Sequence, residues 1–181
     1  MLIFFPSYMM LKQFYELWEQ HGIIKRLERL KGVYQEPRES SHYKFVIAAF
    51  YQDVYKKGAM IFAVCRGKIS EGLDFSDDAA RAVILVGIPY PMTVDPKTIL
   101  KKHYLDTHKS GLTGSQWYCQ QATRATNQSI GRVIRHIQDY GNIILIDKRF
   151  DTPQQKDSIT SWLRDSLQVY NDAETAITDY K

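Results

Sequence analysis

Residues 60–75 read MIFAVCRGKISEGLDF, and this stretch decides the fold class. Its first part, Met60 to Cys65, is a continuous apolar run of strand length with no polar alternation. Such runs are typical of strands that are covered on both faces, as in a parallel sheet. Its second part is a polar loop that contains two glycines. A buried strand that leads into such a loop indicates an α/β domain whose loop lies at the carboxyl edge of the sheet.

The rest of the chain alternates between strand and helix patterns. We expect further strands over residues 2–5, 33–35, 82–88 and 142–146. We expect helices from Ser7 to His21, from Ser40 or Ser41 to Gly58, and over 96–108, 116–136 and 153–168. No linker divides these elements. The pattern therefore predicts one α/β domain with a mostly parallel sheet over residues 1–170, followed by a short acidic tail over 171–181.

Composition and charge narrow the classes of function. The chain has 181 residues, of which 44% are hydrophobic and 24% charged, as in globular proteins. The longest apolar stretch, 82–92, falls short of the ~18–20 residues that span a bilayer, so we expect no membrane segment. Residues 1–150 carry a net charge of +7 and residues 151–181 a net charge of −3, so the body of the chain suits a polyanionic partner. Cys65 and Cys119 stand far apart, and we predict no metal site.

The loop after the strand has the residues of a phosphate-binding loop. Gly67 and Gly72 allow a close approach of the backbone, Arg66 and Lys68 add positive charge, and Ser70 adds a hydroxyl. The alternative is a polar strand-to-helix turn in which the glycines serve only the backbone. Both interpretations remain open on the pattern alone.

A row of basic side chains follows in QSIGRVIRHIQDYG, residues 128–141. At ~100° per residue, Gln128, Arg132 and Arg135 lie within about 60° of one another on the expected helix. Aliphatic side chains occupy the opposite side of that helix. Arginine binds phosphate oxygens with a planar, permanently charged fork, so the row predicts a phosphate-facing surface. The alternative is an ordinary amphipathic helix with solvated arginines.

Two components of a nucleotide site are missing from the sequence. No GxxxxGK[ST] loop occurs, and no adjacent Asp–Glu pair supplies a magnesium site. We therefore expect this chain to form one side of a nucleotide site, without the phosphate cradle and the metal ligands.

Together these segments resemble the second RecA-like motor domain of the XPD/DinG-type family of superfamily 2 DNA helicases with an iron–sulfur cluster. LIFFPSY at 2–8 is similar to helicase motif IV, RGKISEGLDF at 66–75 to motif V, and QSIGRVIRHIQDYG to motif VI. VGIPYP at 86–91 and IILIDKRF at 143–150 are similar to family strands. The resemblance implies a three-layer RecA-like domain of the P-loop NTPase type.

The resemblance also implies an ATP-dependent 5′-to-3′ DNA helicase of the nucleus that acts in DNA repair. By motif position, Arg132 and Arg135 would be arginine fingers on the γ-phosphate of ATP. Gln128, Gly72 and Asp74 would contact the nucleotide or couple it to DNA. The DNA-binding residues implied by the motifs are Ser7, Tyr8, Arg66, Lys68 and Ser70.

Cofactors and partners follow from the same resemblance. ATP, Mg²⁺ and a [4Fe–4S] cluster would belong to the parent enzyme, and the cluster would lie outside this chain. Single-stranded DNA and the N-terminal RecA-like motor domain would be the partners. We expect the chain to be a fragment, a separated domain or a truncated gene product that lacks ATPase activity alone. The alternative function is a non-catalytic nucleic-acid or protein-binding module with the same fold.

Overall fold

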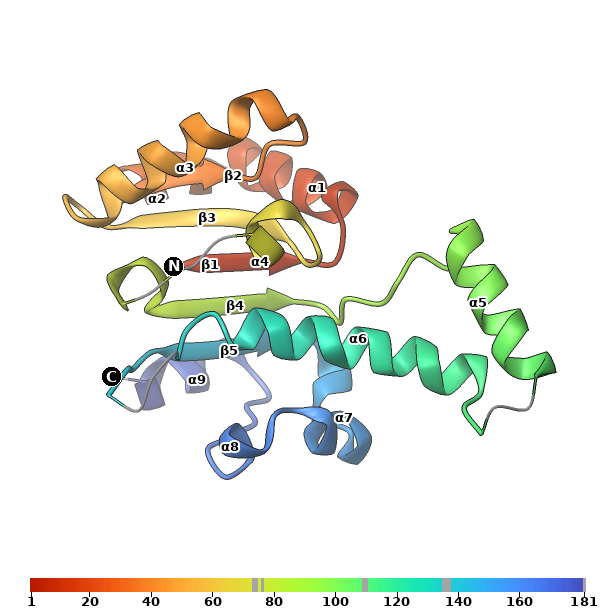
Figure 1. Cartoon of the computed structure of the whole chain (residues 1–181). Coiled ribbons are helices and arrows are strands. Elements are labelled where there is room, and N and C mark those ends of the chain that lie inside the picture. The colour runs from red at the N-terminus through yellow and green to blue at the C-terminus, as the bar shows by residue number, and fades with distance from the viewer. Residues whose placement is uncertain (73–74, 76, 109–110, 135–137, 181) are drawn as a thin grey trace.

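A computed structural model describes residues 1–72, 75, 77–108, 111–134 and 138–180. Within these residues five strands form one sheet with the order β2-β3-β1-β4-β5, and every neighbouring pair is parallel (Figure 1). The strands are β1 (Leu2–Phe5), β2 (Gly32–Gln35), β3 (Ala59–Val64), β4 (Ala82–Val86) and β5 (Asn142–Ile146). The parallel α/β sheet predicted from the apolar runs is confirmed.

The central strand β1 and its neighbour β3 are the most completely buried strands of the sheet. Every residue of β1 and of β3 is buried, and the two strands pair in register from Leu2 opposite Ile61 to Phe5 opposite Val64. Because both faces of these strands are covered, each position has to be apolar. This explains why MIFAV and LIFF show no polar alternation.

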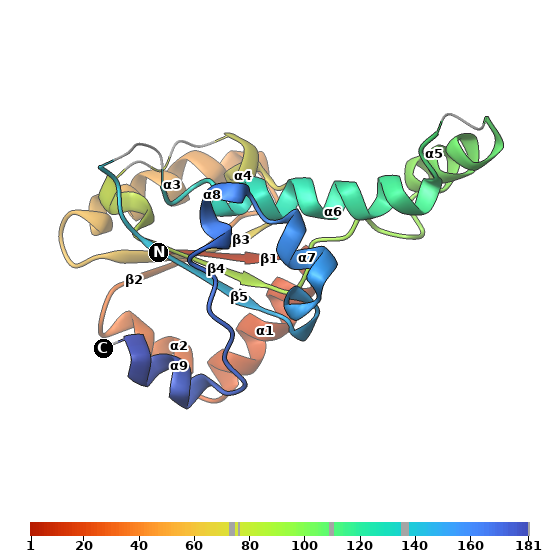
Figure 2. The same ribbon diagram turned by 90° about the horizontal axis from the view of Figure 1, so that it is seen from below.

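Helices cover both faces of the sheet, which gives three layers (Figure 2). One face carries α3 (Ser40–Val54), α4 (Lys68–Gly72) and α6 (Gly114–Ile130), and the other face carries α1 (Tyr8–Gln20) and α2 (Ile23–Glu28). Each face has its own apolar core. Phe50, Phe75 and Val133 contribute to the core under α3 and α6, and Phe62 and Leu11 to the core under α1.

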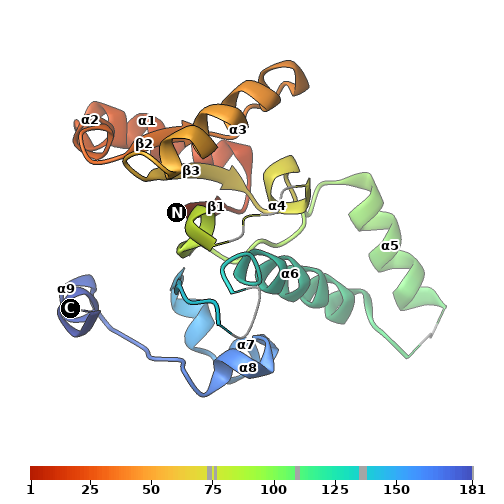
Figure 3. The same cartoon turned by 60° about the vertical axis from the view of Figure 1, so that its left-hand side comes forward.

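The remaining elements lie around this centre. The helix α5 packs on α6, and both extend away from the sheet beyond the carboxyl ends of the strands (Figures 1 and 3). The short helix α9 lies on the same side of the sheet as α1 and α2 but at the β5 end of the strand order, near the strand beginnings (Figures 1 and 2). No helix among the described residues has the length and apolar character to cross a membrane. The bounds of the remaining elements are η1 (Asp77–Ala80), α5 (Pro96–Thr107), η2 (Lys148–Asp151), α7 (Pro153–Ser158), α8 (Ser161–Arg164) and α9 (Ala173–Tyr180).

The helix expected over 116–136 ends earlier than predicted. Arg132 is therefore not part of a helical row of arginines. The helix α6 ends at Ile130, with Gly131 as its C-cap. The chain then turns so that Val133 is fully buried, against the space that Gly141 leaves free of a side chain. Burying the Val133 side chain is thus favoured over continuing the helix past Ile130. The helical-wheel argument that aligned Gln128 with Arg132 is therefore wrong, because Arg132 lies in a turn after the helix.

Three further boundaries differ from the prediction. The helix expected over 153–168 is two short helices, α7 and α8, interrupted at Ile159, which is buried. The short α2 was not predicted. Ser7 does cap α1 through its side chain, whereas α3 has Glu39 as its N-cap residue, without a side-chain hydrogen bond.

Candidate nucleotide and nucleic-acid site

The predicted DNA-binding residues gather at the carboxyl edge of the sheet. Ser7 and Tyr8 follow β1, and Arg66 and Lys68 follow β3. In a parallel sheet the carboxyl ends of neighbouring strands meet at one edge, and β1 pairs directly with β3. Residues about 60 positions apart in the sequence thus share one surface because of the strand order.

Tyr8 is held by two neighbours from the segment after β2. Its hydroxyl donates to Glu36 Oε1 at 3.1 Å, and the Arg38 guanidinium lies 5.4 Å from the centre of its ring. Partial burial and the nearby Glu36 carboxylate raise the pKa of Tyr8 to about 12. The phenol therefore stays protonated at neutral pH and remains a hydrogen-bond donor. The neighbouring Ser7 Oγ accepts from the backbone N–H of Met10 at 3.2 Å.

The loop after β3 is fixed by contacts from distant segments. Arg66 adopts a left-handed backbone conformation, with φ of 63°, and its guanidinium donates to the carbonyl of Gln121 at 2.6 Å. Lys68 is exposed, and its ammonium lies 3.4 Å from the carbonyl of Arg38. Ser70 is 3% exposed, and its hydroxyl donates to the carbonyl of Gly67 at 2.9 Å. Lys68 thus faces solvent, whereas the Ser70 hydroxyl points into the protein.

The structure brings the predicted motif V and motif VI segments into contact. The Arg132 guanidinium donates to the backbone carbonyl of Ser70, a contact between residues that are 62 positions apart. Arg132 is half-buried, so part of its side chain stays accessible beside α4. Gly72 is the last residue of α4, and Gln128 is exposed on the last turn of α6. Asp74 and Arg135 lie outside the described residues.

Two residues at this edge were not predicted from the sequence. Glu36 is 4% exposed, although it follows the short strand β2. Arg38 is exposed and brings a second cation to the surface of Tyr8 and Lys68. A signal was available, because the polar run Glu36-Pro37-Arg38 directly follows a predicted strand, the position at which ligand-binding loops occur.

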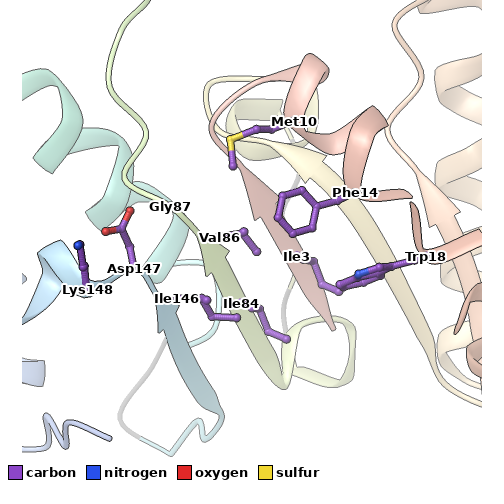
Figure 4. Close-up of a pocket in the computed structure, with 10 residues that line it drawn as sticks. All are labelled: Ile3, Met10, Phe14, Trp18, Ile84, Val86, Gly87, Ile146, Asp147 and Lys148. Atoms are coloured by element: carbon purple, nitrogen blue, oxygen red, sulfur yellow. The ribbon is translucent and has the colours of Figure 1, made fainter. Parts of the chain in front are cut away.

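An apolar pocket lies apart from this site, on the α1 face of the sheet (Figure 4). It has a volume of about 450 Å³ and contains none of the predicted site residues. Trp18 and Phe14 of α1 lie opposite Ile146 of β5 across it. The residues that line it are Ile3, Met10, Phe14, Trp18, Ile84, Val86, Gly87, Ile146, Asp147 and Lys148.

The cysteines do not fit an iron–sulfur cluster. A [4Fe–4S] cluster takes four thiolate ligands, and the sequence holds two cysteines. Cys65 is buried, and burial raises the pKa of its thiol to about 11, which disfavours the thiolate that a metal requires. Across the described parts of the chain, no group of three or more His, Cys, Asp or Glu side chains is placed to hold a metal ion.

Comparison with known proteins gives one consistent family. Residues 1–166 match the family model described as the helicase C-terminal domain. The chain is 46% identical, over 99% of its length, to the regulator of telomere elongation helicase 1 of Rattus norvegicus, and 43% identical, over 99%, to that of Homo sapiens. It spans 15% and 16% of those relatives. Within the family, residues 95–106 and 115–136 predict closest similarity to this helicase, with the Fanconi anaemia group J helicase next, and similarity to the first is confirmed.

Solved structures agree with the family. The structure described as "XPD_APO" is 27% identical, with a TM-score of 0.59, over 87% of this chain and 30% of that one. The structure of S. tokodaii Xpd4 has the same fold, with a TM-score of 0.54 over 89% of this chain and 29% of that one. The contact between motifs V and VI, the parallel sheet and the match over residues 1–166 lead to one conclusion: the chain belongs to the helicase C-terminal domain family.

Proposed function

We propose that this chain is the second motor domain of an ATP-dependent DNA helicase with 5′-to-3′ polarity. Its partners would be single-stranded DNA and an N-terminal RecA-like motor domain, and it would work in the nucleus, in telomere maintenance and DNA repair. The names of the relatives support a telomeric helicase. The observation that carries the proposal is the hydrogen bond from Arg132 to the Ser70 carbonyl, because Arg132, the proposed phosphate-binding residue, there contacts the loop that leads to the proposed DNA-facing residues.

In this proposal Arg132 and Arg135 act on the γ-phosphate of ATP. Phosphoryl transfer spreads negative charge over the transferred group, and a guanidinium stabilises that charge in the transition state. Gln128 would contact the nucleotide beside them. Gly72 and Asp74 would couple nucleotide and DNA, because they continue the segment that Arg132 holds at Ser70.

The DNA would run along the carboxyl edge of the sheet. Tyr8 and Lys68 face the same surface there, and Arg66 and Ser7 flank them. Ser70 would contribute through the position of α4, since its hydroxyl already donates to Gly67. ATP and Mg²⁺ would bind in the parent enzyme between the two motor domains, where Mg²⁺ neutralises phosphate charge. This chain supplies one side of that site, so we propose that it does not hydrolyse ATP alone.

A chimaera in which this chain replaces the corresponding segment of the rat relative tests the proposal. Arg132→Ala should lower the DNA-stimulated ATPase rate by ~10³–10⁵, the effect of losing an arginine finger. Arg124→Ala is the matched control, because Arg124 is an exposed arginine on α6, about two turns before the helix ends. Affinity for single-stranded DNA should stay near the parent value in both variants. The melting temperature of Arg132→Ala should fall by no more than the loss of one hydrogen bond, about 1 kcal/mol, explains.

The opposite result would point to a structural arginine. If Arg132→Ala kept ATPase activity within a few-fold of the parent while the melting temperature fell, the finger assignment would be wrong. If the parent chimaera bound DNA but never hydrolysed ATP, the non-catalytic binding module would replace the motor.

A further inference from the structure

One buried carboxylate, that of Glu36, connects three segments of the carboxyl edge. Its Oε2 accepts from the backbone N–H of Val64 at 2.8 Å, at the end of β3. Its Oε1 accepts from the N–H of Ile69 in α4 at 3.2 Å and from the hydroxyl of Tyr8 at 3.1 Å. A carboxylate that is 4% exposed is costly to bury, and these three donors offset that cost.

The loop above the carboxylate is built around it. A Cβ atom at Gly67 would lie 2.5 Å from Glu36 Oε1 and 2.8 Å from Oε2. The loop therefore passes so close to the carboxylate that only glycine fits without a shift. Gly67 therefore packs against Glu36, which lies 31 positions earlier in the sequence. A glycine that served only the flexibility of the loop backbone would not need to lie against this carboxylate.

The contacts continue from Glu36 to Arg132. Ile69, which donates to Glu36, precedes Ser70, whose carbonyl accepts from Arg132. A continuous series of hydrogen bonds and one peptide link thus runs from Tyr8 through Glu36 and α4 to Arg132. One end of the series lies among the proposed DNA-facing residues and the other end is the proposed ATP-facing arginine.

We propose that Glu36 is a positioning residue that fixes Tyr8 and α4 relative to each other and thereby links DNA contact to the position of Arg132. The inference rests on the proposed function. Glu36 itself would contact neither DNA nor ATP. It would act through the Tyr8 hydroxyl and the Ile69 N–H, so that Arg38 above the Tyr8 ring and Lys68 of α4 face one DNA strand together.

The first test measures DNA affinity of the 181-residue chain by fluorescence anisotropy with oligo(dT) at low salt. Glu36→Gln keeps the shape of the side chain but replaces one acceptor oxygen by an amide N–H₂. It should weaken binding by about tenfold, the size of a lost hydrogen bond to a charged group. Tyr8→Phe should also weaken binding, and the double variant should bind no more weakly than Glu36→Gln alone, because both changes break the same link.

The structure offers a matched control at the opposite edge of the sheet. Tyr34 donates to Asp53 Oδ2 at 2.8 Å, which is the same kind of phenol–carboxylate bond, near the beginning of β2. Tyr34→Phe should lower the melting temperature about as much as Tyr8→Phe while leaving DNA affinity within about twofold of the parent. This control separates loss of stability from loss of positioning.

The second test follows Arg132 directly. In the ¹⁵N-labelled chain, the Arg132 Nε–H resonance, assigned with Arg132→Lys, should shift when oligo(dT) binds. It should not shift in Glu36→Gln at DNA concentrations that saturate the variant. An Arg132 resonance that is unmoved in the parent, or that moves equally in the variant, overturns the proposal.

The outcomes distinguish a failure of the Glu36 inference from a failure of the proposed function on which it rests. If the parent binds oligo(dT) and a folded Glu36→Gln binds within about twofold of it, Glu36 does not position the surface and the proposed function stands. If Glu36→Gln does not fold, Tyr8→Phe decides, and parent-like affinity in that variant overturns the inference. Strictly additive effects of the two changes would also overturn it. A parent chain that binds no DNA would overturn the proposed DNA surface and the inference with it.

Discussion

Gly67 lies where the chain turns from β3 towards α4, directly over the Glu36 carboxylate. Around it, polar side chains satisfy the backbone before any ligand binds. Ser7 caps α1, Arg66 bonds the carbonyl of Gln121, and Ser70 bonds the carbonyl of Gly67. Sequence position could predict that these residue types lie in one loop region. It could not predict the direction of each side chain, because that depends on partners up to 55 positions away.

Gly67→Ala tests how tightly the loop is packed on Glu36. The new methyl group would meet both carboxylate oxygens and the carbonyl of Val64 at 2.8 Å, so overpacking should lower the free energy of unfolding by about 3 kcal/mol. Gly22→Ala is the control. Gly22 has φ of 69° and open space around it, so alanine there costs only backbone strain, about 1 kcal/mol. Urea unfolding measures both, and equal losses would mean that the loop moves away from Glu36 without cost.

At the scale of helices and strands, the sequence predicts correctly which segments are strands and which are helices, but it predicts the ends of several helices incorrectly. The strands β1 and β3 are marked by apolar runs because both their faces are buried, and all five strands of the sheet were expected. The predicted end of α6 was wrong because Ile130 and Val133 are both buried and have the spacing of a helix face. Two residues buried on either side of a turn give the same sequence pattern. The site then depends on that turn, since it is what places Arg132 beside Ser70. A tertiary contact therefore decided what local periodicity could not.

Two phenol–carboxylate bonds join neighbouring elements and give the fold a dependence on alkaline pH. Tyr8 bonds Glu36 after β2, and Tyr34 of β2 bonds Asp53 of α3. The pKa of each phenol is raised from about 10 to about 12, by burial first and by the carboxylate second. Between these values the folded chain keeps both protons and the unfolded chain releases them. Their contribution to stability is therefore complete below pH 10 and is lost as pH rises towards 12.

We expect urea unfolding to show lower stability at about pH 11 than at about pH 9. Tyr8→Phe and Tyr34→Phe should each reduce this difference, because each removes one group whose pKa changes on folding. Ultraviolet absorbance of tyrosinate during an alkaline titration of the folded chain should show Tyr8 and Tyr34 among the phenols that ionise late. If neither variant altered the pH dependence of unfolding, the two bonds would not persist in solution.

At the scale of the whole molecule, the charges are separated along the chain and in space. Residues 1–150 carry +7 and residues 151–181 carry −3. Arg38 and Lys68 are at the carboxyl edge, whereas α9, with Glu174 and Asp179, lies near the strand beginnings at the β5 end of the sheet (Figures 1 and 2). The family match ends at residue 166, before this acidic segment. We therefore propose that residues 1–170 are the folding unit and that 171–181 are an appended tail.

Removal of residues 171–181 tests that boundary and the place of the DNA surface together. The tail lies towards the strand beginnings and away from the carboxyl edge (Figures 1 and 2), and most of its side chains are exposed, with Ile177 59% exposed. At about 0.1 M salt its charges are screened beyond ~10 Å, so the shortened chain should bind oligo(dT) within about twofold of the parent.

Each phosphate neutralised on a single strand contributes about −0.7 to the slope of log affinity against log salt, so a surface with three or four cations should give a slope of about −2 to −3. Anisotropy titrations over a range of salt should return that slope from both chains, and the melting temperature should not change. A large gain in affinity or a steeper slope after truncation would place the tail against the DNA surface, and a fall in melting temperature would extend the domain beyond residue 170.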